Sequence, residues 1–165
     1  TPLGASAKFQ SAGKKTQRKD LGRQMMTYGN VYVAQVAMGA SPAQLLKALT
    51  EAAAYPGPSI VIAYTPCISH GIRAGMSCAQ EEMKKAVEAG FWTLYRYNPL
   101  NREHPLTIDS KKPTGDYREF LRGEARFAAL EMKFPEIAED LFSKAAEDVG
   151  KAYREFLKLE ESMKS

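Results

Sequence analysis

The apolar positions in the first two thirds of the chain form three strand-like runs. Residues 31–38 are almost wholly apolar and stop at Gly39. Residues 59–64 (Ser-Ile-Val-Ile-Ala-Tyr) run without alternation, which is typical of a strand buried on both faces. Residues 91–97 are rich in aromatic side chains and follow directly after Gly90. The pattern therefore predicts three strands.

Helix signals lie between these predicted strands. Ser41 is a favourable N-cap, Pro42 suits the first helical position and Gln44 completes a capping box, so a helix is expected to run to about residue 54. A second Ser-x-x-Gln pattern at residues 77–80 begins a helix that ends at the next glycine. Strands and helices that alternate with short connections predict right-handed crossovers, so we expect an α/β fold with an open, mostly parallel sheet flanked by helices.

The last third of the chain changes to helical spacing after a proline-rich stretch. Residues 99–116 are typical of a surface excursion, within which residues 106–108 add a short edge strand. A helix begins near Tyr117 and Pro135 interrupts it. The longer helix that follows carries an apolar stripe, which is expected to face the protein's own core.

These patterns predict one domain, residues 1–165, because a chain of this length builds one sizeable core. Its expected parts are an extended arm (1–19), a parallel α/β core (20–98) that opens with a short helix at 20–28, the surface excursion (99–116) and a helical C-terminal segment (117–165).

Composition and charge exclude several classes of partner. The excess of 23 Lys and Arg over 19 Asp and Glu leaves a formal charge of +4, and no aromatic platform accompanies it, so nucleic acid is not an expected partner. No apolar run approaches the roughly 18 residues of a membrane-spanning helix. The basic residues cluster near the start of the chain, where a solvated loop is a better interpretation than a phosphate site: Lys14, Lys15, Arg18, Lys19 and Arg23.

Cysteine usage indicates the compartment. Two cysteines form no disulfide framework, and the sequence shows no signal peptide, so we expect a reducing, cytoplasmic location. A P-loop, a dinucleotide-binding glycine fingerprint and a nucleophile elbow are all missing from the sequence. No isolated pair of carboxylates lies in an apolar setting, so no catalytic or cofactor-binding residue is assigned, and Trp92 is assigned to the core.

Cys67 is the candidate for chemistry. It lies in a tight loop after the strand predicted at residues 59–64, and ligands gather outside the carboxyl ends of strands in open α/β sheets. A thiolate there is well placed to meet a metal cluster or a cofactor. The alternative is a buried and inert cysteine, because free cysteine is among the most buried residue types.

His70 follows Cys67 by three residues, which raises the alternative of a metal-binding pair or a thiolate activated by imidazole. A closed metal site needs about four ligands, and the chain offers only Cys78 and His104 in addition. A complete metal site within these residues is therefore not expected. Cys78 falls in the first turn of a predicted helix, where a small buried side chain is the favoured role.

The sequence resembles the pyruvate:ferredoxin (flavodoxin) oxidoreductases over nearly its whole length. The residues that carry the resemblance are 1–5 (Thr-Pro-Leu-Gly-Ala), 19–23 (Lys-Asp-Leu-Gly-Arg), 26–34 (Met-Thr-Tyr-Gly-Asn-Val-Tyr-Val-Ala), 56–64 (Pro-Gly-Pro-Ser-Ile-Val-Ile-Ala-Tyr), 67–68 (Cys-Ile), 91–99 and 109–111 (Asp-Ser-Lys). The resemblance implies the carboxyl-terminal half of a thiamin-diphosphate-binding domain, and so half of that fold.

Members of this family oxidatively decarboxylate pyruvate with coenzyme A (CoA) to acetyl-CoA and CO2, and pass electrons through 4Fe-4S clusters to ferredoxin or flavodoxin. The resemblance implies thiamin diphosphate and Mg2+ as further cofactors of a homodimeric parent enzyme. A cysteine matching Cys67 supplies the last thiolate of the cluster nearest the thiamin in the family, and thiolates are the usual ligands of such clusters. The resemblance therefore favours Cys67 as a metal ligand.

The sequence departs from the family in what it lacks. The Gly-Asp-Gly motif that binds diphosphate and magnesium, the Ser-Asn-Thr-Gly-Gly run and the other three cluster cysteines are not in these 165 residues. We therefore expect a fragment that works with the remainder of the parent enzyme and is inactive and without cofactor when isolated. Two alternatives stay open: a non-catalytic α/β interaction module, and a related 2-oxoacid oxidoreductase with another substrate.

Overall fold

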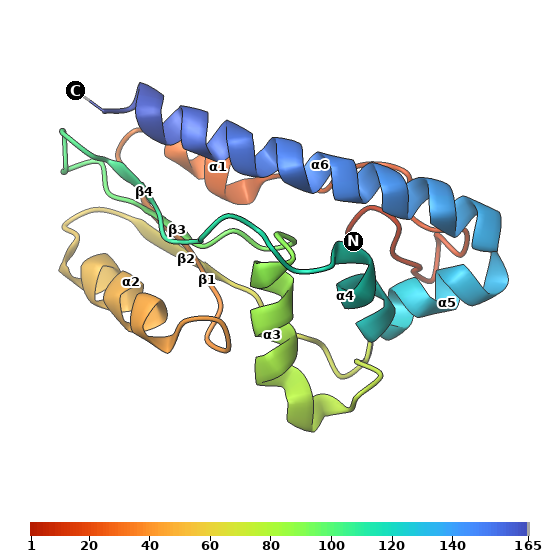
Figure 1. Ribbon diagram of the computed structural model, residues 1–165. Coiled ribbons are helices and arrows are strands. Elements are labelled where there is room, and N and C mark those ends of the chain that lie inside the picture. The colour runs from red at the N-terminus through yellow and green to blue at the C-terminus, as the bar shows by residue number, and fades with distance from the viewer. Residues whose placement is uncertain (165) are drawn as a thin grey trace.

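A computed structural model describes residues 1–164, and in it four strands form one open sheet with helices on both faces (Figure 1). The strands are β1 (Tyr32–Val36), β2 (Ser59–Ala63), β3 (Tyr95–Tyr97) and β4 (Leu106–Ile108). The helices are α1 (Leu21–Met26), α2 (Pro42–Ala54), the 3-10 turn η1 (Met76–Cys78), α3 (Ala79–Glu88), α4 (Tyr117–Gly123), α5 (Ala125–Lys133) and α6 (Pro135–Ser162). The predicted α/β class and the short strand at residues 106–108 are confirmed.

The sheet is mixed, with the strand order β2-β1-β3-β4. Strands β1 and β2 pair in parallel, as expected, but β3 runs antiparallel to β1, and β4 runs antiparallel to β3. The parallel direction expected for the third strand is therefore wrong. The strand is also shorter than residues 91–97, because only Tyr95–Tyr97 pair with β1.

The direction of β3 follows from the place of α3. Gly39, just past the end of β1, donates its backbone N–H to Met83 Sδ of α3 at 3.4 Å, so α3 lies beside the carboxyl end of β1 (Figure 1). The chain is still at that end after α3, where Trp92 Nε1 donates to the Val36 carbonyl at 3.0 Å. Because α3 does not return the chain to the other end of the sheet, β3 begins opposite Gln35 and runs back along β1.

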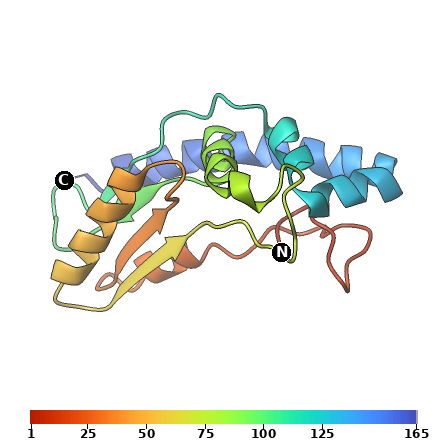
Figure 2. The same cartoon turned by 90° about the horizontal axis from the view of Figure 1, so that it is seen from below.

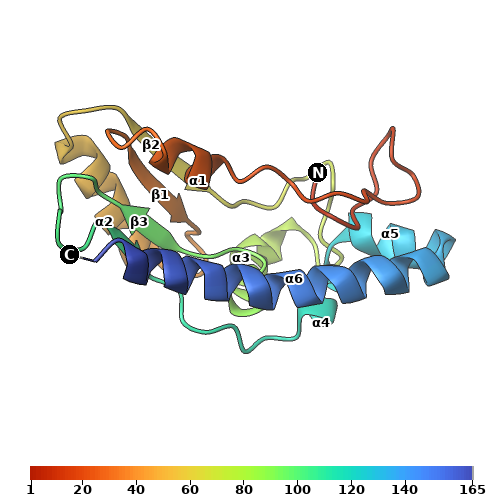
Figure 3. The same ribbon diagram turned by 90° about the horizontal axis from the view of Figure 1, so that it is seen from above.

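Helices cover the two faces of the sheet unequally. Helix α2 packs on one face against Tyr32, Ala34 and Val36. Helices α1 and α6 cover the other face, where Met26 and Phe156 pack on alternate strand residues (Figures 2 and 3). Figure 3 shows α6 running along most of the molecule, from the sheet to the helices α4 and α5.

Strand β2 is not buried on both faces, contrary to the prediction. Its ends, Ser59 and Ala63, are exposed and its three central residues are half-buried, whereas all five residues of β1 are buried. The reason is that β2 is the outermost strand, so one of its edges has no neighbouring strand within residues 1–164. The apolar side chains of β2 are therefore only partly covered by the rest of the described chain.

The helix caps match the sequence signals in part. The Ser41 side chain accepts a hydrogen bond from the Gln44 N–H and begins α2, as predicted. The Gln44 side chain does not close the capping box; it donates instead to the Gln35 carbonyl and to Asp109. Helix α3 begins after Cys78 without a side-chain cap, so the predicted Ser-x-x-Gln cap is wrong although the helix exists.

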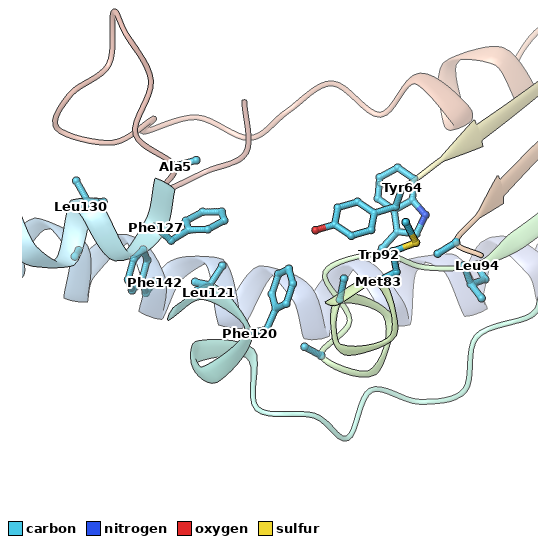
Figure 4. Packing of buried hydrophobic residues seen from close by; sticks show 14 residues of the cluster. Ala5, Tyr64, Met83, Trp92, Leu94, Phe120, Leu121, Phe127, Leu130 and Phe142 are labelled. Carbon is cyan, nitrogen blue, oxygen red and sulfur yellow. The ribbon is translucent and has the colours of Figure 1, made fainter. Parts of the chain in front are cut away.

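The main core lies between the sheet and the C-terminal helices. Tyr64 and Trp92 lie at one end of this cluster, and Phe127, Leu130 and Phe142 lie at the other (Figure 4). The apolar stripe of α6 faces this core, as predicted. Trp92 is 6% exposed, which confirms its assignment to the core.

The C-terminal helical segment has one break that the sequence did not reveal. The helix that begins at Tyr117 ends at Gly123, and α5 follows after Glu124, which is extended. Pro135 then occupies the first position of α6. No helix within residues 1–164 is both long enough and apolar enough to cross a membrane.

Candidate functional site

The loop that carries Cys67 begins where β2 ends. Tyr64, the first residue after the strand, is 8% exposed and donates its backbone N–H to the Val36 carbonyl at 2.9 Å. Its phenol donates to Glu124 Oε1 at 2.5 Å. Desolvation of the buried ring, together with the nearby carboxylate, raises the pKa of the Tyr64 phenol, which therefore stays protonated as the donor. The loop thus leaves the sheet from a fixed position.

Cys67 opens a tight turn. The backbone N–H groups of His70 and Gly71 both donate to the Cys67 carbonyl, at 3.1 and 2.8 Å. Gly71 has a φ of +71°, a conformation that side chains disfavour, so the turn depends on glycine at this position. The turn places the Cys67 side chain outside the core, where it is exposed. Cys67 is therefore not buried, which contradicts the alternative prediction of a buried cysteine.

Backbone contacts attach the far side of the loop to the junction of α4 and α5. The Arg73 N–H donates to the Gly123 carbonyl at 2.8 Å, and the Ala125 N–H donates to the Gly71 carbonyl at 3.2 Å. Ile72 and Glu124 form an antiparallel bridge between these two bonds. The break between α4 and α5 therefore has a function in the fold, because Glu124 pairs with the Cys67 loop.

The turn also favours the ionised thiol. Backbone N–H groups of His70 and Ser69 near Sγ hold the pKa of the Cys67 thiol below its ordinary value. The thiolate is the form that binds metal. A small cavity of about 120 Å³ adjoins the turn and is lined by Thr65, Pro66, Cys67, His70, Gly71, Ile72, Glu124 and Arg126. An exposed, ionisable thiol beside a cavity fits one ligand of a metal cluster.

Two charged side chains, Glu124 and Arg126, line the cavity together with the Cys67 turn. Glu124, which is 3% exposed, accepts from Arg126 Nε at 3.0 Å as well as from Tyr64. Glu82 of α3 is 4% exposed, and burial together with the charge of Glu124 raises the pKa of its carboxyl group. Glu124 and Arg126 were not foreseen from the sequence, because their contacts to Tyr64 and the turn span about sixty positions.

The structure brings together only one pair of the predicted site residues. His70 lines the cavity beside Cys67. Cys78 is half-buried at the start of α3, and His104 is exposed in the turn before β4, so neither lines that cavity. Within residues 1–164 no group of three or more His, Cys, Asp or Glu side chains is placed to hold a metal ion.

Comparison with known proteins gives two results. A scan against models of protein families finds no match. Among curated proteins, the chain is 54% identical over 164 residues to the pyruvate:ferredoxin oxidoreductase of Moorella thermoacetica, which covers 98% of the chain and 14% of that protein. It is 51% identical over 162 residues to the pyruvate-flavodoxin oxidoreductase of Klebsiella pneumoniae, which covers 96% of the chain and 14% of the relative.

A further relative, the pyruvate dehydrogenase [NADP(+)] of Cryptosporidium parvum, is 46% identical over 150 residues, covering 84% of the chain and 8% of the relative. The chain thus spans about 14% of the length of the first two relatives. Nearly the whole chain is homologous to one segment of the pyruvate-flavodoxin and pyruvate:ferredoxin oxidoreductases.

Proposed function

We propose that the chain is a segment of an enzyme that oxidatively decarboxylates pyruvate with CoA, forming acetyl-CoA and CO2, and passes the electrons through 4Fe-4S clusters to ferredoxin or flavodoxin. The observation that carries this proposal is an identity of 50% or more to three such oxidoreductases over at least 96% of the chain. The segment keeps Cys67 in an exposed turn at the carboxyl end of the parallel strands.

Within this enzyme, Cys67 is proposed to supply one thiolate of a 4Fe-4S cluster. Its exposed side chain, its lowered pKa and its backbone-anchored turn all suit a ligand that must keep one position in both oxidation states. A fixed ligand lowers the reorganisation that electron transfer requires. The cluster, when bound, carries single electrons away from the site of pyruvate oxidation.

The residues present do not fit thiamin diphosphate or Mg2+ by themselves. No cluster of carboxylates suited to a metal ion occurs within residues 1–164, and the chain has no Gly-Asp-Gly run. We therefore place these cofactors, and the remaining cluster ligands, in the rest of a cytoplasmic, homodimeric parent enzyme. The half-covered β2 suits this arrangement, because its free edge and apolar side chains are what a larger sheet would cover.

The names of the relatives share pyruvate and differ in the electron acceptor, since one names flavodoxin, one ferredoxin and one NADP(+). The segment therefore suits the reaction of pyruvate, which the names of all three relatives share. Ferredoxin or flavodoxin is proposed as the partner of the parent enzyme because three relatives that are at least 50% identical to the chain carry those names.

The half-covered β2 also favours a second candidate, a non-catalytic interaction module that docks through its sheet edge. One experiment separates the two. The 165-residue chain and the longer polypeptide encoded in frame with it are purified without oxygen, and each is assayed for pyruvate- and CoA-dependent reduction of methyl viologen. The enzyme proposal predicts activity and bound iron in the longer protein alone. A longer protein that holds iron and lacks this activity would reject it.

A further inference from the structure

A second cavity, larger than the one beside Cys67, lies on the α1/α6 face of the sheet. Its volume is about 460 Å³, which is in the range of small-molecule sites. Gln35 and Ile62 line it near the carboxyl ends of β1 and β2, and residues 17–22, from the end of the arm to the start of α1, also line it. Helix α6 closes the side opposite the sheet. The cavity thus lies where α/β sheets commonly bind ligands.

Arg18 is the distinctive residue in this cavity. Its guanidinium carbon lies 4.7 Å from the ring centre of Trp92 and 5.6 Å from that of Phe91, and both rings line the cavity. Stacking on two rings orients the planar guanidinium and leaves its N–H groups available. Within residues 1–164 this guanidinium has no hydrogen bond to a side chain or carbonyl and no ion pair.

The carboxylates that line the cavity all have other partners. Asp20 and Glu155 lie 3.4 and 3.0 Å from the Arg23 guanidinium. Asp148 accepts a short hydrogen bond from Gln17 and lies 3.9 Å from Lys151 Nζ. The cavity walls take water from the Arg18 guanidinium and lower its pKa, and the attraction of Asp20 offsets only part of that loss. The Arg18 side chain as a whole is nevertheless exposed, and within residues 1–164 its guanidinium forms no ion pair, so it can bind an added anion.

We propose that this cavity binds a small organic anion, with its carboxylate or phosphate on the Arg18 guanidinium and its apolar body against Trp92, Phe91 and Ile62. A guanidinium is suited to both kinds of oxyanion because its fork of N–H donors matches two oxygens at once. The apolar walls favour an anion with a hydrocarbon part over inorganic phosphate. This site is separate from the Cys67 cavity and does not depend on the proposed enzyme activity.

Trp92 makes the proposal testable, because it is the single tryptophan of the chain and lies beneath Arg18. The fluorescence of the 165-residue chain is titrated at constant ionic strength with hexanoate, with monohexyl phosphate, with neutral hexanamide and with inorganic phosphate. We expect saturable changes with one or both organic anions, and little change with hexanamide or inorganic phosphate. The stronger of the two anions identifies the preferred head group.

Two variants assign the signal to the cavity. Arg18→Gln is expected to weaken binding on the order of tenfold or more, because it removes the charge-assisted hydrogen bonds. Lys15→Gln removes an equal charge from an exposed position of the same arm that does not line the cavity, and should bind like the unmodified chain. Equal binding by hexanoate and hexanamide, or equal affinity in Arg18→Gln, would reject the site.

A modification experiment in the longer polypeptide covers the case in which the short chain is unstable alone. Phenylglyoxal reacts with accessible arginines, and mass spectrometry measures the modified fraction at Arg18. We expect Arg18 to react without ligand and to be protected by hexanoate or monohexyl phosphate. An Arg18 that is already unreactive without added anion would show that another part of the protein fills the cavity, and would overturn the proposal.

Discussion

Arg96 is the centre of a polar network between the sheet and α2. Its guanidinium donates to Asp109 through Nε at 2.9 Å and Nη2 at 2.8 Å, and to Glu51 through Nη1 at 2.6 Å. Tyr32 donates to the same Glu51, and Gln44 donates to Asp109. The side chain of Arg96 is only 11% exposed, so the two carboxylates, in place of water, stabilise the charge of its guanidinium. These hydrogen bonds raise the pKa of Arg96 and keep it ionised.

Replacement of Arg96 by methionine should therefore be costly. It leaves Asp109 and Glu51 without their cation at positions with little access to water, and we expect a loss of about 3 kcal/mol in the free energy of unfolding. Arg122→Met is the control, because the Arg122–Glu131 pair is exposed to solvent and should contribute much less to stability. Urea denaturation measures both variants; similar losses would contradict this description of the network.

Glu82 makes stability depend on pH. Burial and the charge of Glu124 raise its pKa in the folded protein above the ordinary value that it has in the unfolded chain. Between these two pKa values the folded state binds more protons than the unfolded state, so stability falls as pH rises through that window. Glu82→Gln should remove this loss and therefore stabilise the protein at pH values above the window.

The test is urea denaturation of Glu82→Gln over a pH series, with Glu81→Gln as the exposed neighbouring control. The stabilisation by Glu82→Gln should shrink at pH values below the ordinary pKa of a glutamate, where both states are protonated. If Glu82→Gln and the unmodified protein differ by the same free energy of unfolding at every pH, the carboxyl charge of Glu82 is not the cause of the difference.

At the scale of elements, the contact between the end of β1 and the start of α3 decides the topology. A Cβ atom on Gly39 would lie 2.1 Å from the carbonyl oxygen of Gln80, so only glycine allows this approach. The contact holds α3 at the carboxyl end of the parallel strands, and it is the reason that β3 returns antiparallel. It also positions Glu82 and Met83 against the core.

Gly39→Ala tests this contact, and Gly150→Ala is a control that is expected to change stability in the opposite direction. Gly39→Ala must move the backbone of α3 and should cost several kcal/mol, on the order of other severe overpacking changes. Gly150→Ala lies within α6, where its Cβ would meet only Arg154 Nη1 at 3.4 Å, and should stabilise the helix by about 0.5–1 kcal/mol. Thermal unfolding of both variants provides the comparison, and a neutral Gly39→Ala would show that the contact is loose.

The sequence predicted the features that depend on neighbouring residues. Ser41 and Pro42 mark the start of α2, and the apolar stripe predicted the buried face of α6, because capping and periodicity are local. The direction of β3 was not predictable, since it depends on the contact of Gly39 with Gln80 forty-one positions away. Likewise, the position of Cys67 in a loop after β2 was predictable, but the place of Glu124 beside that loop was not, because a bridge to Ile72 brings it there.

At the scale of the whole molecule, the free edge of β2 should govern association. Within residues 1–164 no strand pairs with its outer edge, and edges of this kind promote pairing between chains. The isolated chain is therefore expected to self-associate. Lysine at the two exposed strand positions, in the variant Ser59→Lys/Ala63→Lys, should block pairing and leave the fold intact.

Sedimentation of the isolated chain and of this double variant measures the effect. We expect a concentration-dependent larger species for the unmodified chain and a monomer for the variant, with equal helix content by circular dichroism. A monomeric unmodified chain would show that the edge is already protected, and would argue against a missing neighbour for β2.

The central claim is that Cys67 is a cluster ligand in an oxidoreductase, and iron analysis with electron paramagnetic resonance tests it most directly. The parent polypeptide is purified without oxygen as the unmodified protein, as Cys67→Ser and as Cys78→Ser. We expect Cys67→Ser to lose the iron and the reduced-state signal of one cluster, and Cys78→Ser to keep both, because Cys78 is half-buried and does not line the Cys67 cavity. An unchanged iron content and spectrum in Cys67→Ser would contradict the account.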